Sequence, residues 1–170
     1  MPNWCFNTVT LTHEDVSKVD ALSTVLSKSE ESGESDVFNF LRPRPADQED
    51  NWYDWNVSNW GTKWDICPTV FERDEDNRVR VDFETAWGPP IALYDFLTAE
   101  GWRVEAYYEE SGCGFCGKYE YGQDDCYEYT LDSWESIDAI PQDIAEFAGL
   151  HSAYEHYQEE LKAEEGEENV

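Results

Sequence analysis

Two cysteines with a spacing that suits metal binding are the first candidates for chemistry in this sequence. Cys113 and Cys116 form a C-x-x-C pair, which can supply two zinc ligands or a redox dithiol at a helix N-terminus. A structural zinc needs four ligands, and with no second C-x-x-C pair the set would have to include Cys126, Cys5 or a histidine. Because Cys116 begins an expected strand, no helix dipole would lower its thiol pKa. The spacing therefore favours a tight turn with semi-buried thiols, and we expect no metal and no cofactor.

The other residue types that serve catalysis show no catalytic spacing. His13, His151 and His156 lack an H-E-x-x-H pattern, and the sequence contains no G-x-S-x-G elbow, P-loop or G-x-G-x-x-G turn. Adjacent acid pairs are expected by chance in a chain with 39 Asp and Glu residues. The sequence therefore names no catalytic residue and favours a binding protein over an enzyme.

Aromatic residues are concentrated between Asn51 and Asp65, which hold half of the eight tryptophans. An indole buries well over about 150 Å², so such a cluster can fill a core or form a binding surface. We favour the core-filling interpretation. The alternative is a small-ligand or nucleotide-binding protein, enzymatic or not, with a pocket of Trp60, Lys63, Trp64 and Trp87. The full candidate cluster is Trp52, Trp55, Asn59, Trp60, Lys63, Trp64 and Trp87.

The net charge of −28 argues against a nucleic-acid-binding protein, which normally carries a basic surface. Acidic residues dominate the second half, where tyrosines are interleaved with them, and this composition suits protein binding. If the predicted hairpin and last helix lie side by side, they form an acidic surface for a host protein, which could mimic nucleic acid; solubility alone is the other explanation. The candidate surface comprises Glu109, Glu110, Asp124, Asp125, Tyr127, Glu128, Tyr129, Glu155, Glu159 and Glu160.

The sequence also bears on location and partners. It has no apolar run near the roughly 20 residues that a membrane span requires, and its start shows no secretory signal. Five cysteines is an odd number for a disulfide framework. We therefore expect a cytoplasmic protein with reduced thiols and no membrane partner.

Strands and helices alternate along the first half. Residues 3–12 alternate as a strand does, with Cys5, Val9 and Leu11 on one face. The elements expected after it are a helix capped by Thr12 and ending at Lys28, a loop over 29–36, an extended piece over 38–41 and a short helix from Asn51 to Gly61.

The second half continues this alternation. Two strands, Trp64–Glu72 and Val79–Ala86, are expected with a turn over 73–77 between them, followed by a helix Ile91–Glu100 capped by Gly101 and a strand Trp102–Glu109. A hairpin of Phe115–Tyr121 and Cys126–Leu131 follows, with a loop at 122–125. The chain is then expected to be helical over 133–149, with Pro141 in a first turn, and to end in a last helix through Leu161.

The order strand-helix-strand-strand-helix-strand predicts an α+β fold, the ferredoxin-like split βαβ plait. An appended β-hairpin and C-terminal helices extend it. The predicted divisions are a ferredoxin-like domain over 1–131, with an aromatic insertion at about 38–65, a helical extension over 132–162 and a disordered acidic tail over 163–170.

Four motifs resemble a protein family carried by bacteriophages and conjugative plasmids. They are Met1–Cys5 (M-P-N-W-C), Asn59–Asp65 (N-W-G-T-K-W-D), Thr85–Pro90 (T-A-W-G-P-P) and the glycine-rich Gly112–Gly117. The resemblance covers roughly residues 1–130. It implies a mobile-element accessory protein with a ferredoxin-like domain of unknown function, and it brings no catalytic residues. The family pattern more often has serine where this chain has Gly88.

Overall fold

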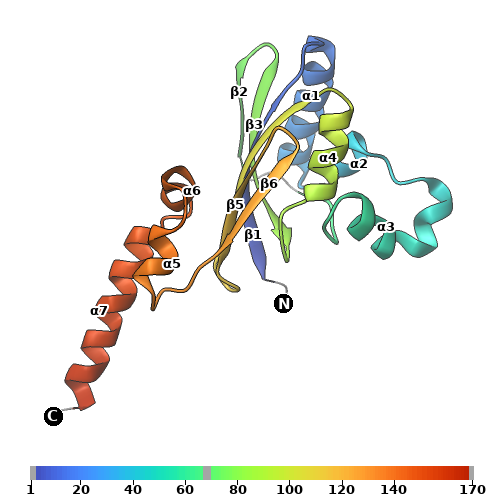
Figure 1. The fold of residues 1–170 in the computed structure, drawn as a ribbon. Coiled ribbons are helices and arrows are strands. Elements are labelled where there is room, and N and C mark those ends of the chain that lie inside the picture. The colour runs from blue at the N-terminus through green and yellow to red at the C-terminus, as the bar shows by residue number, and fades with distance from the viewer. Residues whose placement is uncertain (1–2, 67–69, 169–170) are drawn as a thin grey trace.

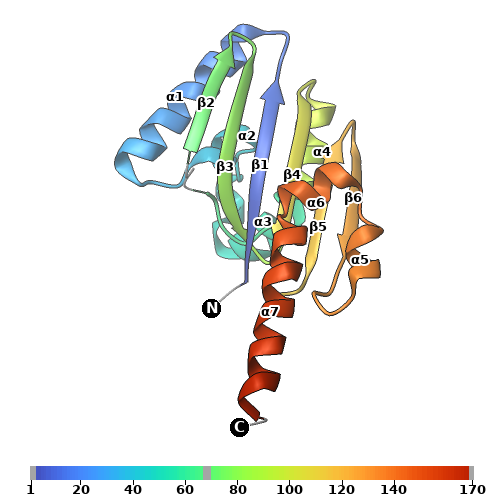
Figure 2. The same ribbon diagram turned by 90° about the vertical axis from the view of Figure 1, so that its left-hand side faces the viewer.

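The structure, a computed structural model, describes residues 3–66 and 70–168. Its centre is a six-stranded antiparallel sheet with the strand order β2-β3-β1-β4-β5-β6 (Figures 1 and 2). The strands are β1 (Trp4–Thr12), β2 (Val70–Glu75), β3 (Arg78–Ala86), β4 (Arg103–Glu110), β5 (Phe115–Glu120) and β6 (Gln123–Glu128). The first four strands have the order of the ferredoxin-like plait, and the β5–β6 hairpin extends the sheet beyond β4. This confirms the predicted fold class.

Helices cover both faces of the sheet. One face carries α1 (Val16–Ser32), α2 (Val37–Leu41), the 3₁₀ helix η1 (Ala46–Asn51), α3 (Trp52–Asn59) and α4 (Ile91–Ala99). The opposite face carries α5 (Trp134–Asp138) and α6 (Gln142–Phe147), and α7 (Leu150–Glu168) leads away from the sheet (Figure 1). None of the helices in the described ranges is long and apolar enough to cross a bilayer.

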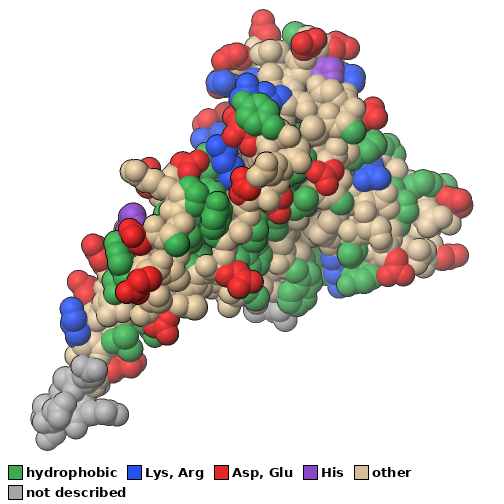
Figure 3. Space-filling model, in the orientation of Figure 1, with side chains coloured by type: hydrophobic (Ala, Val, Ile, Leu, Met, Phe, Trp, Pro, Cys, Tyr) green, Lys and Arg blue, Asp and Glu red, His purple; other side chains and the backbone are tan. Residues whose placement is uncertain are grey.

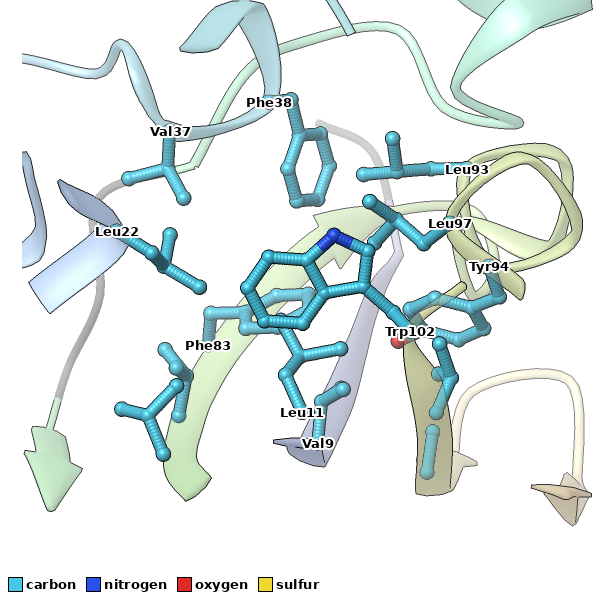
Figure 4. Packing of buried hydrophobic residues seen from close by; sticks show 14 of the residues in the cluster. Val9, Leu11, Leu22, Val37, Phe38, Phe83, Leu93, Tyr94, Leu97 and Trp102 are labelled. Atoms are coloured by element: carbon cyan, nitrogen blue, oxygen red, sulfur yellow. The ribbon is translucent and has the colours of Figure 1, made fainter. Parts of the chain in front are cut away.

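The main core lies between the sheet and α1, α2 and α4. On β1, Cys5, Val9 and Leu11 are buried as the alternation predicts. Figure 4 shows the Trp102 indole between Leu22 of α1 and Leu97 of α4, so one aromatic ring fills the space between the two helices. This packing fixes α4, and with it the loops that meet the N-terminus of α4.

A second cluster attaches the C-terminal helices to the other face. Ile137, Ile144 and Leu150 pack with Cys116 of β5 and with Tyr129. Each fully buried aliphatic side chain contributes about 1.5–3 kcal/mol, so these contacts hold α5, α6 and the start of α7 on the sheet. Beyond its first turns, α7 projects past the sheet (Figure 2).

Helix α1 begins later and ends later than its sequence predicts. The N-cap is Asp15, whose carboxylate accepts a hydrogen bond from the Ser17 amide at 3.0 Å, and the predicted cap Thr12 belongs to β1. The helix continues to Ser32, where Gly33 ends it in a left-handed conformation at φ 70°. The loop predicted from residue 29 is therefore helical in its first half.

The extended piece predicted at 38–41 is wrong, because a distant carboxylate caps a helix there. The two Asp65 oxygens accept hydrogen bonds from the amides of Phe38 and Asn39, each at 2.8 Å. These amides are among the unpaired donors of the first turn of α2.

The predicted strand Trp64–Glu72 is also wrong in extent, since β2 begins at Val70; residues 67–69 lie outside the described part of the chain.

The hairpin turn is tighter than predicted. Tyr121 and Gly122 have φ values of 54° and 77°, and Glu120 pairs directly with Gln123. Positive φ at both central residues is typical of a two-residue hairpin turn, whose twist matches that of the strands. Because the turn is this short, β6 starts within the segment predicted as a loop.

Helix α7 extends further than predicted. It continues through Glu168, so the segment expected to be disordered from Ala163 is helical up to that residue.

Candidate functional site

The tryptophans of the aromatic cluster divide into an inward and an outward group. Trp60 is 2% exposed, and its indole nitrogen donates a hydrogen bond to the Arg42 carbonyl at 3.0 Å. Trp55 meets the Trp60 ring edge-on at 5.6 Å. Asn59 stays within this scaffold, since its side-chain amide donates to the Trp55 carbonyl at 2.9 Å. These residues stabilise the core, and the enclosed Trp60 ring is not available to a ligand.

Hydrogen bonds hold the chain that follows Trp60 at several points. The Asn56 side-chain amide donates to the Lys63 carbonyl at 2.8 Å, and the Thr62 hydroxyl donates to the Ala86 carbonyl at 3.2 Å. Asp65 is bonded to the start of α2, and burial raises the pKa of its carboxyl above the usual value. The loop between α3 and β2 is thereby tied to α2, α3 and the end of β3.

The outward group is exposed, and ring and cation–π contacts link Tyr53, Lys63, Trp64 and Trp4. The Lys63 ammonium lies 4.3 Å from the centroid of the Trp64 ring and 5.7 Å from that of Tyr53. Trp64 in turn lies 6.1 Å from Trp4 on β1. The Trp87 backbone lies beside Trp4, because the Trp87 amide donates to the Asn3 carbonyl at 3.0 Å and the preceding residue, Ala86, is paired with Trp4.

We call this surface the aromatic platform; its members are Trp4, Tyr53, Lys63, Trp64 and Trp87. Trp64 is 40% exposed and Trp87 is 59% exposed. Trp52, 37% exposed, continues the platform through an edge-on contact with Tyr53. The predicted pocket of Trp60, Lys63, Trp64 and Trp87 is not formed, because Trp60 is enclosed by the core while the other side chains face outward.

The structure removes Glu110 from the predicted acidic surface. It is only 2% exposed, and its carboxylate accepts hydrogen bonds from the amides of Gly112 and Cys113 at 2.7 and 2.8 Å. Burial raises its pKa, but hydrogen bonds from Cys113, Gly112 and Asn3 outweigh that effect and hold the pKa below the usual value. Glu110 is thus an ionised buried group that fixes the turn after β4.

Glu109 and Tyr129 also lie mostly inside. Tyr129 is buried in the second cluster, and its hydroxyl donates to the half-buried Glu109 carboxylate at 3.3 Å. Burial raises the pKa of Glu109. Tyr108 and Tyr119, which belong to the same run of interleaved tyrosines, are fully buried as well. Several tyrosines of the second half are therefore part of the core and are withdrawn from the predicted binding surface.

The acids of β6 point to opposite faces of the sheet. Asp124 accepts a hydrogen bond from the Tyr108 hydroxyl at 2.6 Å, and burial raises the pKa of Asp124. Asp125 lies on the other face, where it lines a hollow of about 290 Å³ with Lys118 and Tyr127. Glu128 is exposed near the end of the strand. Charges on an edge strand also hinder pairing with other chains.

The acids of α7 are remote from those of the hairpin. Glu155, Glu159 and Glu160 are exposed, and α7 diverges from the sheet instead of running beside β6 (Figures 1 and 2). Figure 3 shows acidic side chains distributed over the visible face, including the projecting helix. The predicted continuous surface of hairpin and helix is therefore wrong; the charge is dispersed.

The three cysteine candidates do not converge. Cys113 is exposed in the turn, and its sulfur accepts a hydrogen bond from the Asn3 amide at 3.3 Å. Cys116 is buried against the C-terminal helices, and burial raises its pKa to about 11. Cys126 points to the opposite face, since Cys116 pairs with Tyr127 in the register of the two strands. Within the described ranges, no group of three or more His, Cys, Asp or Glu side chains is placed to hold a metal ion.

Two members of the platform were not singled out from sequence. Trp4 lies on the face of β1 that the alternation leaves away from the main core, which was a usable signal. Tyr53 lies within the aromatic stretch but gave no sign of a contact with Lys63. The left-handed conformation of Trp87 (φ 76°) has no signal in the residue type.

Comparison with known proteins supports the fold. Residues 63–165 match the family described as a ferredoxin-like domain in Api92-like protein. The chain belongs to this family. The match begins in the loop that carries Lys63 and Trp64 and continues into α7, so it includes the C-terminal helices. Among curated proteins, none matches the sequence.

One solved structure is similar over a limited part. A crystal structure of the protein api92 from Yersinia pseudotuberculosis is 26% identical, over 46% of this chain and 30% of that chain, with a TM-score of 0.36. The present chain thus spans less than a third of the length of that relative.

Proposed function

We propose that this chain is a non-enzymatic accessory protein of a phage or another mobile element. In this proposal it acts in the host cytoplasm and binds a basic host protein, one that itself binds nucleic acid, whose site the acidic chain blocks as a polyanion mimic. Neither nucleic acid nor a membrane is a direct partner. The resemblance to phage and plasmid proteins supports the origin, and the charge supports the partner.

The observation that carries the proposal is the uncompensated charge of the second half. After Arg103 the sequence holds 19 acidic residues and two lysines, and Lys118 is already held by Glu120 at 2.9 Å and by Asp143 at 3.5 Å. Such a field attracts basic partners over distances near the Debye length, about 8 Å at physiological salt. Because the acids are dispersed over β6, α5 and α7, they suit long-range attraction better than a defined contact.

A pull-down from a host lysate at low and moderate salt tests the proposal. We expect a nucleic-acid-binding protein that is lost as salt rises and that added duplex DNA releases. Capture of partners that DNA does not release would contradict the mimic.

A charge-matched pair of variants makes the pull-down specific. Glu155→Gln, Glu159→Gln and Glu160→Gln together should weaken capture. The same net change at Glu30, Glu31 and Glu34, which are exposed at the end of α1 and in the loop after it, should have the smaller effect. Equal effects would indicate that only total charge matters.

A further inference from the structure

Trp87 combines two features that packing alone does not explain. Its backbone is left-handed at φ 76°, a conformation that strains residues with a β-carbon, and its indole is 59% exposed. Glycine would fit this backbone without strain, and a tryptophan with so much exposed surface contributes little to the core. Strain of this kind collects at binding sites. The side chain therefore points to a role at the surface.

The platform that includes Trp87 is held rigidly from below. The Leu93 amide donates to the Trp60 carbonyl at 3.2 Å, which joins the α3–β2 loop to α4. Gly61 allows this approach, since a β-carbon there would lie 3.1 Å from the Ile91 nitrogen. With the Thr62 bond to Ala86, the two tryptophan motifs form one unit. An aromatic surface fixed before binding loses little entropy when a partner docks.

Charge selects the occupant among the candidates. A second copy and a nucleic acid would both be repelled by a chain of net charge −28, whereas a basic protein would be attracted. Indole faces attract cations, and Lys63, 4.3 Å from the Trp64 centroid, already shows that this ring accepts one. Arginine suits such faces best because its planar guanidinium also stacks.

We infer that the aromatic platform docks an arginine-bearing segment of a basic protein partner, with guanidinium groups stacked on Trp4, Trp64 and Trp87. The inference rests on the proposed function, from which it takes the basic partner, and it adds the contact surface. The dispersed acids then attract the partner, and the platform holds it.

The test uses a hexa-arginine peptide as the probe. Its binding to the full chain is measured from the indole NMR signals at about 0.5 M salt, where attraction between distant charges is screened. Trp64→Ala and Trp87→Gly should each weaken binding by roughly 2- to 30-fold. Trp87→Gly adds no backbone strain, and an unchanged circular dichroism spectrum would exclude loss of folding as the cause of its effect. Trp134→Ala is the matched control, because Trp134 is also 40% exposed but lies on α5; it should have no effect.

The sign of the Lys63→Gln effect identifies the occupant. If guanidinium groups occupy the platform, removal of this competing cation should tighten binding. If Lys63→Gln binds hexa-arginine more weakly than the unmodified chain does, the inference is overturned. It is also overturned if a single-stranded oligonucleotide binds the unmodified chain more tightly than it binds Lys63→Gln. Concentration-dependent dimers that Trp87→Gly abolishes would overturn it as well, in favour of a second copy.

The acidic variants separate this inference from the proposed function. The triple change at Glu155, Glu159 and Glu160 should leave peptide binding at about 0.5 M salt intact, because screening removes the contribution of distant charge. If the tryptophan variants bind the peptide normally while the acidic variants lose the lysate partner, the platform inference fails and the proposed function stands. The reverse result would reject the acidic mimic.

Discussion

The aromatic loop and the acidic second half expose their side chains in different ways. Around Trp64, buried neighbours fix each exposed group: Asn56, Thr62 and Asp65 bond the same loop to three elements. Along α7, the exposed acidic side chains belong to a helix that itself leaves the sheet. The first arrangement gives the exposed groups a fixed geometry, and the second gives an electrostatic field without one. Exposure alone therefore does not identify a site; what lies beneath the exposed group does.

The largest expected effect contrasts the inward and outward tryptophans. Trp60→Ala should lower the free energy of unfolding by about 3–5 kcal/mol, because it leaves a large cavity and an unpaired Arg42 carbonyl. Trp64→Ala should change it by less than about 1 kcal/mol. Urea unfolding followed by circular dichroism measures both. Equal losses would show that Trp64 is part of the core and would end the distinction.

A second contrast concerns the buried and exposed acids. Glu110→Gln should reduce stability by about 1–3 kcal/mol at neutral pH, since amide donors lose their charged acceptor. Asp125→Asn, on the exposed edge strand, should be within about 0.5 kcal/mol of the unmodified chain. The comparison is made by chemical denaturation at pH 7.

The pH dependence sharpens this contrast. The folded-state pKa of Glu110 lies below its ordinary value of 4.5, so the folded state binds fewer protons than the unfolded state. Its contribution is present above pH 4.5 and is lost as the pH falls through the lower folded-state pKa. The stability difference between the unmodified chain and Glu110→Gln should therefore shrink in acid. A constant difference from pH 7 to pH 3 would contradict the assignment.

A smaller effect is expected at the strained position of the platform. Trp87→Gly should be more stable than Trp87→Ala by about 1 kcal/mol, because only the alanine keeps a β-carbon in the left-handed conformation. Thermal unfolding of the two variants provides the measurement. Equal midpoints would mean that the backbone at this position is not strained.

The smallest effect on stability is expected on α7. The combined Glu-to-Gln changes at 155, 159 and 160 should alter the free energy of unfolding by no more than about 0.5 kcal/mol, since these side chains are exposed. The same variant should slow association with a basic partner at low salt. Substantial unfolding would instead place these residues in a structural contact.

Much of the fold was predictable because local patterns agree with it. The alternation along β1 identified its buried face, and Gly101 marked the end of α4. The candidate sites were less predictable. Residue type does not distinguish Trp60 from Trp64, or Glu110 from Asp125, because the members of each pair differ in the groups that surround them. For Glu110 these groups include Gly112 and Cys113 nearby in the chain as well as the distant Asn3.

The sequence by itself determined the order of the core strands and of the two long helices between them, the ferredoxin-like class and the excess of negative charge, because propensity, periodicity and composition are local quantities. Only the tertiary structure decided that Asp65 caps α2, that Glu110 is buried, and that Trp4 and Trp64 are in contact beside the Trp87 backbone. The physical reason is that hydrogen-bond partners and burial depend on segments far apart in the chain, whose approach is set by the packed sheet and helices.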